Sequence, residues 1–217
     1  MESSFERLSR SKLFMVGEII WDLLILSLLW VICSLPLVTI GASSSALYFA
    51  VHRRFALGYD TPSKDFLRSF KLNIKQGLIT GIIFLLYAGA SAFNIRVAVF
   101  GFGELTLPDW YFPVSLLLLL PLFFACPMTF PYIARFNNDT KHLLINSTLL
   151  SVMNPGRTLL IWFYTLTAAA LMVFFPPAAL IAPAGFTFLI MRTAEKSFAV
   201  AKANEERRQN GETDNDA

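Results

Sequence analysis

The chain consists of long apolar stretches separated by short polar segments that carry most of its charges. A helix of about 20 apolar residues crosses a hydrocarbon core of about 30 Å, and several of these stretches reach that length. The second stretch is the weakest, because only residues 37–51 of it are free of charge, which leaves a short span or a re-entrant segment. The pattern predicts six membrane-crossing stretches: 13–35, 37–57, 74–97, 112–135, 156–175 and 178–193.

Two of the intervening polar segments have the pattern of amphipathic helices. In the first, 58–76, Thr61 followed by Pro62 is typical of a helix start, and an apolar residue recurs every four positions from Phe66. The second, 137–154, is less basic. We expect both helices to lie along the cytoplasmic membrane surface. The basic residues of the first helix are expected to contact anionic lipid head groups or a cytoplasmic partner: Lys64, Arg68, Lys71 and Lys75.

The composition agrees with a membrane protein. Of the 217 residues, 55% are hydrophobic and only 15% are charged, whereas a soluble domain carries roughly a quarter charged residues. The predicted fold class is therefore all-α, a polytopic transmembrane helical bundle. We expect one transmembrane domain over 1–198 and a polar, disordered cytoplasmic tail over 199–217.

The basic residues predict how the chain is oriented. If the six stretches cross the membrane, every Lys and Arg except Arg96 falls in segments that share one side with both termini. Basic residues accumulate on the cytoplasmic side, so both termini are expected in the cytoplasm. A five-span arrangement would place a basic block outside. The +3 net charge is explained by this asymmetry and gives no reason to expect nucleic-acid binding.

Three segments resemble the YesL-like family of uncharacterised bacterial integral membrane proteins. They are LLWVICSLPLVTIGA over 28–42, DFLRSFKLN over 65–73, and the segment 146–160 with its Pro-Gly-Arg-Thr-Leu-Leu end. The resemblance implies a multi-pass protein of the bacterial cell membrane. Genes of this family often lie beside those of carbohydrate ABC transporters and glycoside hydrolases, which implies an accessory role in sugar uptake. The resemblance supplies no catalytic or binding residues.

Few residues remain as candidates for chemistry. Glu18 and Asp22 lie on one face of the first helix, and ionisable groups inside a membrane are costly unless they have a partner. They form either a proton, cation or solute site or, as the favoured interpretation, a structural ion pair with a residue such as Arg192 or Arg157. Arg96 either reaches water by snorkelling or recognises an external solute or partner.

A pair of glycines and the absence of enzyme motifs complete the prediction. Gly77 and Gly81 form a GxxxG pair that permits close helix approach, within the monomer or between copies. The sequence contains no HExxH, GxSxG, Walker or dinucleotide motif, so neither catalysis nor a cofactor is expected.

Two functions remain open at this point. The first is a non-enzymatic accessory or regulatory membrane protein that associates with carbohydrate ABC-transporter subunits. The alternative is a small solute transporter or solute-binding subunit that uses the Glu18/Asp22 pair.

Overall fold

The computed structural model describes residues 12–101, 108, 110–136 and 139–215, and in these ranges helices are its regular secondary structure. Its side chains are described from Phe14 to Lys202 within these ranges. The α-helices are α2 (Lys12–Ser34), α3 (Ile40–Ala56), α4 (Pro62–Phe100), α5 (Tyr111–Leu117), α6 (Leu120–Arg135), α7 (Thr140–Met153), α8 (Pro155–Phe174) and α9 (Ala182–Asn215). Two short 3-10 helices, η1 (Leu37–Thr39) and η2 (Pro176–Leu180), connect α2 to α3 and α8 to α9.

Four helical segments among the described residues are long and apolar enough to cross a membrane: Phe14–Ser34, Pro62–Phe100, Tyr111–Arg135 and Pro155–Phe174. They coincide with four of the six predicted stretches. The other two, 37–57 and 178–193, correspond to α3 and to the start of α9. Helix α3 has only 17 residues, with a run of serines and with Arg53 and Arg54 in its last turn. The first half of α9 carries three charged residues: Arg192, Glu195 and Lys196.

Helix α4 joins two segments that the sequence separates. The expected helix over 58–76 and the expected span over 74–97 form one α-helix of 39 residues. The helix begins at Pro62, as predicted, but contains no later proline that would break it. At 1.5 Å per residue it is about 58 Å long, roughly twice the thickness of a hydrocarbon core. A continuous helix cannot lie flat on the membrane with one half and cross it with the other, so the break expected near Ile74 is wrong.

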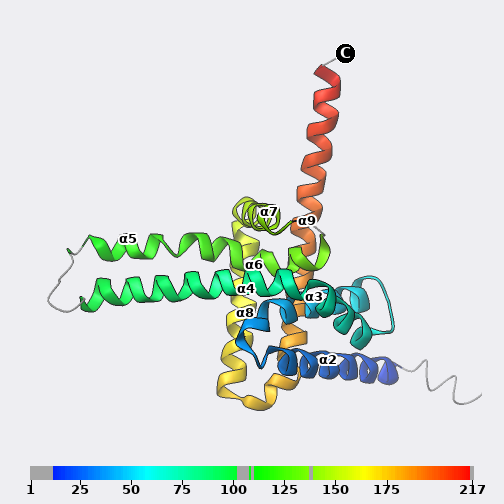
Figure 1. Ribbon diagram of the computed structural model, residues 1–217. Helices are drawn as coiled ribbons and strands as arrows, with labels where there is room; N and C mark the ends of the chain where they lie inside the picture. The colour runs from blue at the N-terminus through cyan, green and yellow to red at the C-terminus, as the bar shows by residue number, and fades with distance from the viewer. Residues whose placement is uncertain (1–11, 102–107, 109, 137–138, 216–217) are drawn as a thin grey trace, which may run out of the picture.

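The helices pack as antiparallel pairs (Figure 1). Helix α3 lies along the first half of α4, and α5 lies along the second half, where the Tyr87 hydroxyl donates to the Leu118 carbonyl. Helices α8 and α9 form a hairpin around η2 that runs crosswise to α4 and α5. The prolines at 127 and 131 lie inside α6. Helix α9 continues to Asn215, through most of the predicted tail.

The contact between α3 and α4 depends on glycine. A Cβ built on Gly77 would lie 2.5 Å from the Cα of Ala42, and one built on Gly41 would lie 2.5 Å from the Gly77 carbonyl oxygen. The two backbones touch, so no side chain fits between them. The first glycine of the GxxxG pair therefore serves packing within the monomer, and Gly81 is looser, with 3.4 Å to the nearest atom.

We expect Gly77→Ala to lower the free energy of unfolding by about 1–3 kcal/mol, because the added methyl group forces α3 and α4 apart. The matched control is Gly89→Ala in the same helix, where a Cβ meets nothing within 4 Å. It should leave stability unchanged or raise it slightly through higher helix propensity. Denaturation in detergent micelles measures both variants. Equal stabilities would show that the close approach does not limit this packing.

Candidate functional site

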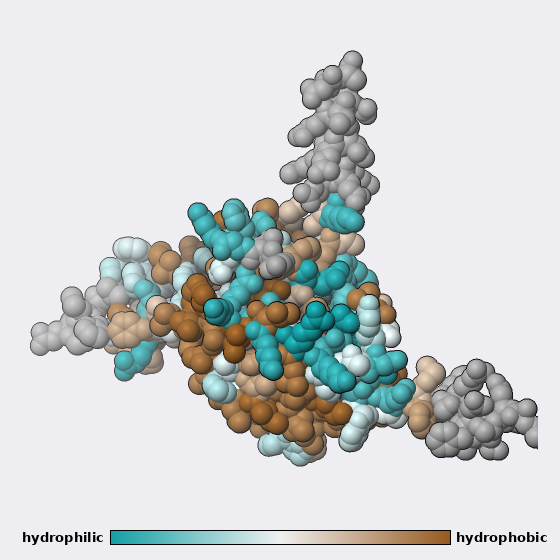
Figure 2. Space-filling model, turned by 45° about the vertical axis from the view of Figure 1, so that its right-hand side comes forward, coloured by the Kyte–Doolittle hydropathy of each residue, from teal (hydrophilic) through white to brown (hydrophobic). Residues whose placement is uncertain are grey.

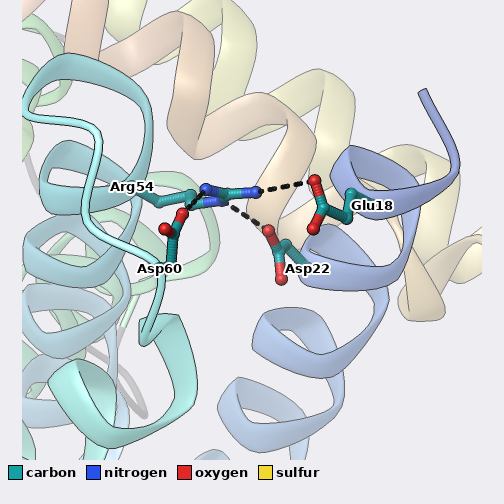
Figure 3. Close-up of polar contacts among 4 residues, drawn as sticks. All are labelled: Glu18, Asp22, Arg54 and Asp60. Carbon is teal, nitrogen blue, oxygen red and sulfur yellow. Dashed lines mark hydrogen bonds and ion pairs between the residues drawn. The ribbon is translucent and has the colours of Figure 1, made fainter. Parts of the chain in front are cut away.

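The two acidic residues of α2 meet a single arginine at the end of α3 (Figure 3). The Arg54 Nε atom lies 2.5 Å from Asp22 Oδ2, and an Arg54 Nη2 atom lies 3.8 Å from Glu18 Oε2. Asp60, in the loop between α3 and α4, pairs with the third nitrogen of the guanidinium. The group points from α3 toward the face of α2 that carries both carboxylates, as the i, i+4 spacing predicts. We call these four residues the Arg54 cluster.

Burial divides the Arg54 cluster into an inner pair and an outer pair. The side chains of Arg54 and Asp22 are only 15% and 14% exposed, whereas those of Glu18 and Asp60 are 59% and 86% exposed. A buried charge requires a partner, because its desolvation is costly. The Arg54–Asp22 pair therefore joins α2 to α3, and the outer carboxylates add little in water.

The partner of the acidic residues differs from the ones expected. Arg192 lies over the Phe188 ring at 4.7 Å, and Arg157 donates to Asn154 and to the Lys196 carbonyl. Neither has a described salt bridge with Glu18 or Asp22. Sequence reasoning assigned Arg54 to topology alone. One signal was available: Arg53 and Arg54 are adjacent in sequence, and the acidic residues at 18, 22, 60 and 65 carry the opposite charge.

Arg53 forms the neighbouring contact between α3 and α4. Its Nε atom donates to Asp65 at 3.0 Å, and its guanidinium carbon lies 3.9 Å from the Tyr59 ring centroid. Asp65 is buried in the first turn of α4, where a carboxylate is also favoured by the helix dipole. Arg53 thus anchors α3 to α4, and Arg54 anchors it to α2.

A third polar cluster joins α3 and α6 to α9 through Glu195. The Tyr48 hydroxyl donates to Glu195 Oε1 at 3.0 Å, and His52 Nε2 lies 3.4 Å from the same oxygen. Arg135, the last residue of α6, completes the cluster with a salt bridge in which its Nε lies 3.0 Å from Glu195 Oε1. Sequence analysis assigned none of these residues to a site. They are separated by up to 147 positions, so no local pattern connects them.

The remaining predicted residues lie away from these clusters. Arg96 is exposed four residues before the end of α4 at Phe100. This end of α4 lies far from α2, which carries Glu18 and Asp22 (Figure 1). The basic residues of α4 recur at intervals of four, three and four positions, which places them in one stripe along the helix. All four are exposed: Lys64, Arg68, Lys71 and Lys75.

A central pocket of about 330 Å³ lies where α2, α3, α6, α8 and α9 meet. Its walls are mostly apolar and aromatic, with Trp30, Phe130 and Trp162 among the lining residues. The polar groups around it are largely engaged: Trp30 donates to Ser44, and Thr165 donates to the Ile161 carbonyl. Neither Glu18 nor Asp22 lines this pocket.

A second hollow is a wider groove of about 960 Å³ between the end of α6, α7 and α9. Arg135, Glu195 and Lys202 line it beside apolar side chains from all three helices. It is therefore amphipathic, with apolar walls and a charged side. Among the described residues, no group of three or more His, Cys, Asp or Glu residues is arranged to hold a metal ion.

We expect Arg54→Gln to lower the free energy of unfolding by about 3 kcal/mol, because it leaves the buried Asp22 carboxylate without its partner. Asp60→Asn removes an exposed partner of the same arginine and should cost less than about 1 kcal/mol. Adding Asp22→Asn to Arg54→Gln should recover part of the loss, since the unpaired charge is gone. Denaturant titration in micelles measures all three. A larger loss in Asp60→Asn than in Arg54→Gln would contradict the assignment.

The comparisons with known proteins identify only part of the chain. Residues 23–95 match the model of a family described as a protein of unknown function, DUF624. The match covers the second half of α2, all of α3 and most of α4, so it includes Arg54, Asp60 and the Gly77 contact but not Glu18 or Asp22. Neither the curated proteins nor the solved structures contain a significant match to the chain.

Proposed function

We propose that this chain is a non-enzymatic accessory or regulatory protein of the bacterial cell membrane that assembles with carbohydrate ABC-transporter subunits. The observation that carries the proposal is that the acidic residues at its helix contacts are paired with arginines and a tyrosine. Glu18 and Asp22 are bound to Arg54, and Glu195 is bound to Tyr48 and Arg135. A transport site needs polar groups that are available to a solute, whereas these groups join helices.

The family match is consistent with the YesL-like resemblance, and we propose membership at that level. The charge distribution supports an orientation with both termini in the cytoplasm and six crossing stretches, of which α3 is the short second one. In this orientation Arg53, Arg54, Arg135 and Arg157 share the cytoplasmic side. The polar clusters that join the helices then lie toward the cytoplasm.

The basic stripe on α4 supports contact with anionic lipid head groups. Its residues are exposed, and none takes part in a described salt bridge. Each Lys or Arg near an anionic surface contributes roughly 1 kcal/mol. Because α4 is continuous, the stripe makes the same angle with the membrane as the rest of the helix. Of its four residues, Lys75 is nearest to the apolar half of α4 and therefore nearest to the head groups.

The groove between α6, α7 and α9 supports docking of a transporter subunit. Hydrophilic side chains gather across the upper and middle part of one face of the molecule, above a hydrophobic region (Figure 2). Helix α7 also exposes apolar residues, of which Leu149 and Met153 line the groove. An amphipathic helix of a partner binds such a groove through apolar anchors on one side and charges at the rim.

We expect the tagged protein, solubilised in detergent from its native membrane, to co-purify with the membrane subunits of a carbohydrate ABC transporter. Leu149→Glu should reduce their recovery at least tenfold, because a carboxylate would be buried in the contact. Val152→Glu is the matched control, since Val152 is equally exposed on α7 but does not line the groove. Equal recovery with the two variants, or no transporter subunit with the unaltered protein, would overturn the docking proposal.

We expect proteoliposomes that contain this chain alone to accumulate no radiolabelled mono- or oligosaccharide above protein-free vesicles. A solute path through the Arg54 cluster would instead give uptake that Glu18→Gln or Asp22→Asn abolishes. Such uptake would replace the accessory assignment with that of a transporter. Asp60→Asn is the control, because it alters the outer part of the same cluster without touching α2.

A further inference from the structure

The central pocket has the lining of a site for an apolar chain. Its volume of about 330 Å³ falls at the lower end of the range of small-molecule pockets, about 300–1,000 Å³. Its walls combine aliphatic and aromatic residues with prolines from α6 and α9. It is bounded by helices from both halves of the chain, so it exists only in the complete fold.

The donors around the pocket leave little for a polar ligand. The Trp162 indole donates to the Phe123 carbonyl at 2.8 Å, and the Tyr48 hydroxyl donates to Glu195 at 3.0 Å. The Trp30 and Thr165 donors are engaged as well. The Ser44 and Thr187 hydroxyls are the other polar groups of the lining, so a sugar or an ion that entered would lose most of its hydrogen bonds to water without replacing them. Apolar cavities of this kind also stay free of water and accept apolar molecules.

The opening of the pocket faces apolar surface. Ile40, Thr165 and Ala169 are the exposed residues of its lining, so the pocket reaches the surface beside them. Large apolar side chains next to them in sequence are exposed as well, among them Val38 and Leu166. Helix α8, which carries Thr165 and Ala169, is one of the segments apolar enough to cross a membrane. The apolar molecule that is most abundant beside such a surface is the acyl chain of a membrane lipid.

We propose that the central pocket binds one acyl chain of a bilayer phospholipid, which enters sideways between α3 and α8. The aromatic rings of Trp30 and Trp162 contact the chain, and the head group stays outside at the level of the opening. The bound chain makes van der Waals contacts with lining side chains that would otherwise face an empty cavity. This proposal rests on the pocket alone and is independent of the association with transporter subunits.

The test is to count the phospholipid that stays with the purified protein by native mass spectrometry, after exchange into a detergent with phosphatidylglycerol as the only lipid offered. The unaltered chain should retain one phosphatidylglycerol molecule. Ala169→Phe places a ring in the opening and should reduce the retained fraction at least fivefold. Ala170→Phe is the matched control, because Ala170 is the next exposed alanine of α8 and does not line the pocket.

A second readout locates the lipid in the pocket. With Trp21 and Trp110, both exposed and outside the pocket, replaced by Phe, the emission comes from Trp30 and Trp162. Phosphatidylcholine with brominated acyl chains should quench this emission in the Ala170→Phe background more strongly than in the Ala169→Phe background. Equal quenching, equal lipid retention in the two alanine variants, or an unaltered protein that retains no lipid would each overturn the proposal. A dimer that retains no lipid would assign the pocket to a second copy instead.

Discussion

The contact between Gly77 and Ala42 is the constraint on which the remaining interactions depend. Since the two backbones touch there, the register of α3 against the first half of α4 is determined. That register places Arg53 at Asp65 and directs Arg54 toward α2. It also places Tyr48 and His52 where α9 brings Glu195. Helix α3 therefore acts as the central element, and the core gathers around its middle residues.

The arginines on which the predicted orientation rests also serve packing. A positive charge at the end of an apolar helix remains on the cytoplasmic side, and it also needs a partner once neighbouring helices bury it. The buried Arg54 meets this need with Asp22 of α2, and the more exposed Arg135 pairs with Glu195 of α9. A charge that is used to predict the orientation of the chain in the membrane can thus also determine which helices pack together. Arg96, which is exposed four residues before the end of α4, has no such burial to offset.

The two hollows of the molecule have different chemistry, and Tyr48 lies between them. Its ring lines the apolar pocket, while its hydroxyl reaches Glu195, which lines the amphipathic groove. An occupant of the pocket would therefore contact Tyr48, which is hydrogen-bonded to Glu195 in the wall of the groove. Most charged groups at the helix contacts bind one another, whereas the groove and the basic stripe of α4 present charged side chains at the surface of the described residues.

Local pattern was sufficient for a large part of the fold. The apolar stretches predicted the four long apolar helices, and the Thr-Pro pair predicted where α4 begins, because length, hydropathy and proline stereochemistry act within one segment. The i, i+4 spacing also predicted that Glu18 and Asp22 share a face. Only the tertiary structure decided that α4 is unbroken, that Gly77 meets Ala42, and that Arg54 rather than Arg192 or Arg157 binds the acidic pair. The physical reason is that a buried charge can pair with any opposite charge nearby, and a glycine can contact any backbone that packs against it. The choice among chemically equivalent partners tens of residues apart is made by the packing of whole helices, which no local pattern encodes.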